Sequence, residues 1–94
     1  MIEGELYVFE DSPKCVFAYK SESGGTIYHY ACVNQHYEVR ITGIRPASGT
    51  LSNRPTRIAN DEERSRFYLH LHEAGYYYNM ANIKVIRIST GVLV

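Results

Sequence analysis

No apolar run in this 94-residue sequence reaches the roughly 18 residues that a membrane-spanning helix requires. The chain also has no net charge, because ten basic and ten acidic residues cancel. No overall field therefore attracts nucleic acid or an anionic membrane. The first twelve residues, MIEGELYVFEDS, are acidic and contain no apolar stretch of the signal-peptide type. We therefore expect a cytoplasmic protein without a membrane segment.

Sequence signatures of nucleotide, metal and covalent-catalysis sites are missing as well. The chain has no GxGxxG, no P-loop, no GxSxG, no CxxC and no HxxxH. His70 and His72 are two residues apart on a predicted helix, about 200° around its axis, so they do not share a metal ion. We predict no catalytic, cofactor-binding or metal-ligating residue, no cofactor and no enzyme activity.

The only two cysteines, Cys15 and Cys32, lie in the apolar, strand-like runs CVFAYK and YHYACV. Two cysteines are too few to form a disulfide framework, and thiols in such runs are typically inert and buried. We interpret them as free thiols. Their distance in space stays open, and so does pairing across neighbouring strands. His29 and His36 could in principle join either cysteine at a metal ion, but the spacings typical of zinc sites are absent. A Cys–His catalytic pair is possible on paper, and the apolar setting of the thiols argues against it.

Residues 5–44 have the composition of an antiparallel meander, with strands expected at 5–10, 15–20, 26–33 and 37–44. Turn residues separate these runs about every ten positions. Strict alternation in residues 26–33 places one set of side chains on one face (Ile27, His29, Ala31, Val33) and a second set on the other (Tyr28, Tyr30, Cys32). Such a sheet curls to protect its edges, which favours an SH3-like or partly open barrel.

A loop is predicted at residues 45–57, which are dense in Pro, Ser, Gly, Asn and Arg. Residues 50–51 have the composition of a brief strand within it. Arginines in and beside the loop, together with some of the nine tyrosines, are the candidate binding surface: Arg40, Arg45, Arg54, Arg57, Tyr28, Tyr30 and Tyr77. The simpler interpretation, which we favour, is solvated loop charge and tyrosines that wall a small barrel. The alternative is a platform for bases or a peptide.

The clearest element is a helix at residues 60–74. Asn60 is a good N-cap, Glu63 completes a capping box, and Gly75 ends the helix. Acidic residues in the first turn suit the helix dipole.

One face of this helix is apolar and is expected to pack on the sheet. Phe67, Leu71 and Ala74 form the stripe, Tyr68 widens it, and Leu69 lies outside it and is expected to be exposed. This packing leaves no hollow in which reactive groups meet.

A final strand is predicted at residues 83–88, with Val85 and Ile88 directed inward. An apolar tail follows at residues 89–94. It is expected to extend the sheet, to fray or to pack on another copy.

Residues 58–88 combine an acidic helix start (ANDEE, 59–63), an Ala-Gly-Tyr stop (74–76) and an aromatic-Asn pair before the last strand (Tyr78-Asn79). This order resembles a pattern in small uncharacterised proteins of phages and mobile elements from gut-dwelling bacteria. Those relatives usually carry tryptophan where Tyr78 stands. The resemblance covers about a third of the chain, and it implies an architecture but no activity.

The sequence therefore predicts a single α+β domain: a small curled antiparallel sheet with one helix packed on it before the final strand. The function expected is that of a non-catalytic accessory or protein-interaction module, phage or mobile-element derived. Its partner is expected to be another protein or a second copy. Nucleic-acid binding through the loop arginines is the alternative.

Overall fold

The computed structural model describes residues 1–41, 50–51 and 54–93, the side chains of residues 50–51 excepted. They form one helix and nine strands. The strands are β1 (Leu6–Phe9), β2 (Ser12–Ser23), β3 (Thr26–Val33), β4 (Val39–Ile41), β5 (Thr50–Leu51), β6 (Thr56–Ile58), β7 (Tyr76–Asn79), β8 (Lys84–Arg87) and β9 (Val92–Leu93), and the helix is α1 (Asp61–Glu73). The α+β class and the short strand at residues 50–51 are confirmed.

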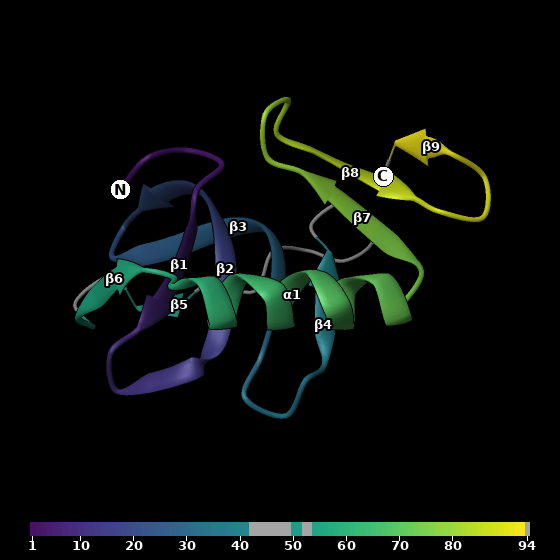
Figure 1. Cartoon of the computed structure of the whole chain (residues 1–94). Helices are drawn as coiled ribbons and strands as arrows, with labels where there is room; N and C mark the ends of the chain where they lie inside the picture. The colour runs from purple at the N-terminus through teal and green to yellow at the C-terminus, as the bar shows by residue number, and fades with distance from the viewer. Residues whose placement is uncertain (42–49, 52–53, 94) are drawn as a thin grey trace.

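The strands form two antiparallel sheets, where the sequence predicted one. In the larger sheet the order is β4-β3-β2-β1-β6, with β5 paired to β3, and this sheet is open among the described residues. The smaller sheet has the order β7-β8-β9 and leads away from the end of α1 (Figure 1). Tyr76–Asn79 is a strand that the sequence analysis missed, and its pairing with β8 starts the second sheet.

Several predicted boundaries differ from the observed ones. Strand β2 begins at Ser12, so Ser12 and Pro13 belong to a strand and not to a turn. Residues 56–57 of the predicted loop, together with Ile58, pair with β1 as strand β6. Strand β4 covers Val39–Ile41, and residues 42–44 of the predicted strand lie outside the described residues.

Helix α1 begins as its sequence predicts. The Asn60 side chain accepts a hydrogen bond from the Glu63 backbone N–H (2.8 Å), and the Glu63 carboxylate accepts one from the Asn60 N–H (2.9 Å). Gly75 ends it with φ +94°. Phe67 and Leu71 are fully buried, whereas the prediction for Ala74 is wrong. Ala74 is the C-cap, where the helix has already ended, and it is exposed to solvent.

Two apolar clusters occupy the two faces of the larger sheet. The first lies between the sheet, α1 and the second sheet, and contains Leu6, Val8, Val16, Ala18, Ala31, Val33, Ile41, Ala59, Phe67, Leu71, Tyr78 and Val85. The second lies on the opposite face and contains Tyr7, Phe9, Phe17, Ile27 and Cys32. A continuous core on one face and a smaller one on the other give this sheet two packed faces.

The sequence analysis predicted strict alternation of the side chains in β3, and this prediction is wrong. Ala18 pairs with Ala31 but Tyr19 pairs with His29, which leaves Tyr30 as an extra residue. Such a β-bulge shifts the alternation by one position. Ile27 therefore belongs to the second cluster, whereas Ala31 belongs to the first.

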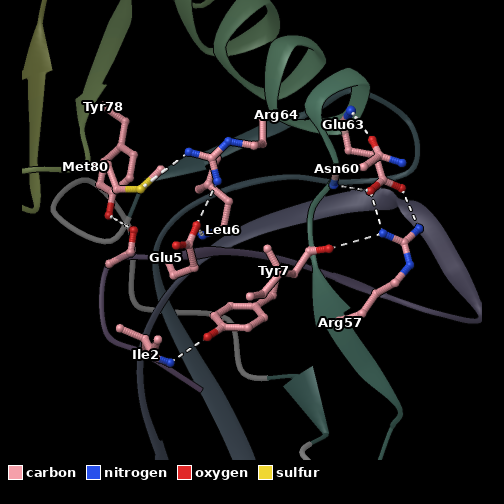
Figure 2. Close-up of polar contacts among 12 residues, drawn as sticks. Ile2, Glu5, Leu6, Tyr7, Arg57, Asn60, Glu63, Arg64, Tyr78 and Met80 are labelled. Carbon is pink, nitrogen blue, oxygen red and sulfur yellow. Dashed lines mark hydrogen bonds and ion pairs between the residues drawn. The ribbon is translucent and has the colours of Figure 1, made fainter.

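Polar contacts connect the helix and the second sheet to the start of the chain (Figure 2). Arg64 on α1 forms an ion pair with Glu5 (2.8 Å) and its other nitrogen lies 3.6 Å from the sulfur of Met80. The buried hydroxyl of Tyr78 donates a hydrogen bond to the Gly4 carbonyl (2.6 Å). These contacts fix the N-terminal segment between the two sheets.

In β8, Val85 is buried as predicted, but Ile88 is 44% exposed. Ile88 lies one residue beyond the strand and two residues after Ile86, so it continues the outer face of the second sheet. No helix in the described part of the chain is long and apolar enough to cross a membrane.

Candidate functional site

The predicted arginines do not form one cationic surface among the described residues. Arg54 forms an ion pair with Asp11 (2.7 Å), and its guanidinium lies 3.9 Å from the centre of the Phe9 ring. Arg57 forms an ion pair with Glu63 (2.7 Å). Arg40 lies on β4, and Arg45 lies outside the described residues. Two of the four arginines therefore already have a carboxylate partner.

The predicted tyrosines belong to different sheets. Tyr28 and Tyr30 lie on β3 and are partly buried. The Tyr30 hydroxyl donates a hydrogen bond to the Glu3 carboxylate, and this bond raises the pKa of Tyr30 to about 12. Tyr77 is on β7, is 51% exposed and stacks on Tyr68 of α1, with 6.4 Å between ring centroids. The rings thus do not form a single base-stacking platform.

Arg40 and Arg54 do meet at a pocket on the second-cluster face of the larger sheet. Its volume is about 280 Å³, and it is lined by Phe9, Ser12, Cys15, His29, Cys32, Asn34, Gln35, His36, Arg40 and Arg54. The expectation that no hollow brings reactive groups together is therefore wrong. Both cysteines and two of the four histidines line it.

The register of the sheet explains why the thiols meet. Cys32 on β3 pairs with Phe17 on β2 and with Arg40 on β4. Cys15 precedes Phe17 by two residues and therefore lies on the same face, diagonal to Cys32. The two sulfur atoms are 3.8 Å apart and both thiols are free. The question that the sequence left open is thus answered: the cysteines are neighbours.

The two histidines reach the pocket by different routes. The bulge at Tyr30 turns His29 to the face that carries Cys32, because in a regular strand these side chains, three positions apart, would lie on opposite faces. His36 lies in the turn between β3 and β4. The Asn34 side chain holds that turn by accepting hydrogen bonds from the His36 (2.8 Å) and Glu38 (3.0 Å) backbone N–H groups.

Electrostatics make the two thiols unequal. A hydrogen bond from the Cys32 thiol and the nearby positive charge of Arg54 lower the pKa of Cys15. The hydrogen bond to Cys15 and burial raise the pKa of Cys32, with Arg40 opposing in part. Cys15 is also partly exposed, whereas Cys32 is buried. Cys15 is therefore the thiol with the greater thiolate character and the better access to solvent.

The pocket has no metal-binding geometry in the part of the chain that is described. Neither in the pocket nor elsewhere in those residues do three Cys, His, Asp or Glu side chains lie close enough together to hold a metal ion. The residues that line the pocket therefore support thiol chemistry.

A second candidate surface is the outer face of the second sheet. Tyr77 pairs with Ile86, which pairs with Leu93, so the three side chains form a row across β7, β8 and β9. Tyr77 and Leu93 are 51% and 56% exposed. Leu69 of α1 is 54% exposed, which confirms its prediction. The sequence analysis missed this row because it did not assign Tyr76–Asn79 to a strand.

Comparisons with known proteins identify no relative. A scan against protein-family models, a search of curated proteins and a search of solved structures each found no match.

Proposed function

We propose that this protein is a small, non-catalytic interaction module of accessory type, and that a second copy of the chain is the partner that its surface fits best. The observation that carries the proposal is the apolar row Tyr77–Ile86–Leu93, which crosses the second sheet and ends on the edge strand β9. The resemblance of residues 58–88 to small phage and mobile-element proteins supports an accessory role of that kind.

Strand β9 is an edge strand among the described residues, since the sheet order ends with it. An edge strand presents unpaired backbone N–H and C=O groups to which another strand can pair. Leu93 and Val92 are both more than half exposed on this edge. Apolar side chains beside an unpaired backbone are the features by which an added strand is recognised.

A second copy satisfies this edge with two-fold symmetry. Antiparallel pairing of β9 with the same strand of another copy joins two three-stranded sheets and makes the two apolar rows continuous. The chain has no net charge, so two copies do not repel each other through their overall field. A two-residue edge buries little area, which predicts a weak, concentration-dependent dimer.

Sedimentation velocity over a wide range of protein concentration tests the proposal. We expect a monomer–dimer equilibrium that Leu93→Lys shifts at least about tenfold toward the monomer, because a charge would be buried in the joined row. Ile58→Lys is the matched control, since Ile58 is 55% exposed on an edge strand of the other sheet. A strict monomer, or equal effects of the two substitutions, would contradict the proposal.

The nucleic-acid alternative has less support, because Arg54 and Arg57 contact carboxylates. Titration with single-stranded and duplex oligonucleotides at low and moderate salt separates it from the proposal. A phosphate-driven complex weakens steeply as salt is added.

A further inference from the structure

The two cysteines at the pocket have the arrangement of an attacking and a resolving thiol. Their sulfur atoms are 3.8 Å apart, on neighbouring strands of one sheet face. Both cysteines line the pocket, but Cys15 is partly exposed, whereas Cys32 is only 7% exposed. A reactive, accessible thiol next to a second thiol is the arrangement typical of redox-sensitive cysteine pairs.

The pocket also carries the charge that such a thiol requires. The hydrogen bond with Cys32 and, to a lesser extent, the charge of Arg54 lower the pKa of Cys15. Arg40 pairs with Cys32 across β3 and β4, and both guanidinium groups line the same pocket. Two positive charges beside the thiols favour an anionic reaction partner.

The backbone at Cys15 leaves room for a disulfide to form. Toward β1, Val16 pairs with Val8 but the next pair is Ser12 with Phe9, so residues 13–15 form a bulge. Toward β3, the described pairing begins at Val16 with Val33. Cys15 therefore lies outside the ladder on both sides. Closing the sulfur–sulfur distance from 3.8 Å to the bonded length of about 2.0 Å therefore breaks no described ladder pair at Cys15.

We propose that Cys15 and Cys32 form a thiol–disulfide exchange site that is oxidised by a low-molecular-weight disulfide bearing carboxylate groups. The Cys15 thiolate attacks one sulfur of that disulfide, forms a mixed disulfide and releases the other half as a thiolate. The Cys32 thiol loses its proton and its sulfur attacks the Cys15 sulfur. This second step forms the Cys15–Cys32 disulfide and releases the remaining half as a second thiol. Starting from the Cys15 thiolate, the protein loses two electrons and the Cys32 proton, and the small disulfide becomes one thiolate and one thiol.

Glutathione disulfide, which carries carboxylates, is the probe. The reduced full chain is mixed with it, quenched in acid at intervals and analysed by intact mass and peptide mapping. We expect the wild type to form the intramolecular disulfide with little mixed adduct. We expect Cys32→Ala to accumulate a glutathione adduct on Cys15. Cys15→Ser should be modified about tenfold or more slowly than Cys32→Ala, because its remaining thiol is buried.

A neutral probe tests the role of the arginines. Oxidation by 2-hydroxyethyl disulfide, which has no carboxylate, should be slower than oxidation by glutathione disulfide, and Arg40→Gln should remove most of this difference. Equal rates with the two probes in the wild type would overturn the anionic preference.

Two further results would overturn the site itself. One is a wild type in which neither thiol reacts under conditions that oxidise free cysteine. The other is a Cys15→Ser variant as reactive as Cys32→Ala. Circular dichroism establishes that each variant folds. If one does not fold, alkylation of the wild type with less than one equivalent of iodoacetamide replaces it, and labelling must then occur at Cys15 in preference to Cys32.

Discussion

Arg54 takes part in three of the interactions that shape the pocket region. It lines the pocket, forms an ion pair with Asp11 and covers the Phe9 ring. The Phe9 ring against the guanidinium and the Asp11 carboxylate, which accepts hydrogen bonds from its Nε and Nη2, hold the positive charge in place near Cys15. The reactivity of Cys15 thus depends on a residue from a segment almost forty positions away in the chain.

The first residue-scale prediction concerns the titration of Cys15. The hydrogen bond with Cys32 and the charge of Arg54 lower its pKa, and burial opposes them. Arg40, His29 and His36 line the same pocket. Because the pKa of Cys15 is lowered, its alkylation rate should rise with pH at lower values than for a free cysteine. Arg54→Gln should move this rise to higher pH, since a positive charge that stabilises the thiolate is lost.

The measurement is the rate of iodoacetamide labelling of Cys15 across neutral and alkaline pH in a protein that keeps Cys32, with peptide mapping to resolve the two thiols. Arg87→Gln, a cation that lies over the Tyr76 ring in the other sheet, is the control and should leave the profile unchanged. The same profile with and without Arg54 would show that this arginine has no electrostatic role at the thiol.

At the scale of elements, helix α1 depends on its first turn. The Asn60–Glu63 capping box satisfies backbone N–H groups that have no helical partner, and the Glu63 carboxylate also accepts both hydrogen bonds from Arg57 (2.7 and 2.8 Å). Asn60→Ala should lower the free energy of unfolding by about 1 kcal/mol. Ser65→Ala, an exposed position on the same helix, should change it by only a few tenths. Urea unfolding followed by circular dichroism measures both.

The same turn predicts an acid-side loss of stability. Arg57 holds the pKa of Glu63 below its usual 4.5, so the folded state binds this proton less readily than the unfolded chain does. The contribution to stability is complete above 4.5 and is lost as the pH falls toward the lowered pKa. Urea unfolding of Glu63→Gln at a series of acidic pH values should show a shallower loss than the wild type. Asp11 beside Arg54 also has a lowered pKa, but it is present in both proteins and its contribution cancels in the comparison. An equal loss of stability in both proteins would therefore refute the role of Glu63.

The helix was predictable because its signals are local. Asn60, Glu63 and Gly75 act within a few residues of the helix ends, so no tertiary information is needed. Strands β6, β7 and β9 are short and depend on partners elsewhere in the chain, which composition does not reveal. The register of the β2–β3 hairpin was within reach. The turn at Gly24-Gly25 places Ser23 opposite Thr26, and counting outward from it places Phe17 opposite Cys32, as observed.

This counting succeeds because two irregularities compensate. Tyr30 is the extra residue on β3, and Lys20 is the extra residue on β2, so the register at the cysteines is that of a regular hairpin. The proximity of Cys15 and Cys32 was therefore predictable in principle. The arrival of His29 and Arg54 at the same pocket was not, because it requires the position of a bulge and of a distant segment.

At the scale of the whole molecule, the two sheets are held together at Gly4. Its φ is +87°, and a Cβ there would lie 2.8 Å from Cγ1 of Ile83 and 3.4 Å from the hydroxyl of Tyr78. Ile83 itself has φ +52°, an unusual conformation for a β-branched residue. A glycine that packs closely against the turn of the second sheet thus fixes how that sheet meets the first.

Gly4→Ala should therefore destabilise the protein more than an alanine at another glycine with positive φ. Gly24→Ala is the matched control, because Gly24 has φ +58° and open space around it. The control should cost about 1–2 kcal/mol for the left-handed backbone alone. Gly4→Ala should add about 1–3 kcal/mol for overpacking. Urea unfolding of both variants tests this. Equal losses of unfolding free energy would mean that Ile83 and Tyr78 can move away from an added Cβ without a measurable penalty.

The extra residue at Tyr30 decides which side of the larger sheet the first half of β3 serves. If the same residues formed a regular strand, Ile27 and His29 would lie on the face of Ala31 and Val33. The second cluster would then lose an aliphatic side chain, and the pocket would lose an imidazole from its wall. Deleting Tyr30 is a different change, because the pairs Tyr19–His29 and Ala18–Ala31 would then follow each other directly and both side chains would keep their faces. We therefore expect the thiol site to tolerate loss of this residue and not the straightening of its bulge.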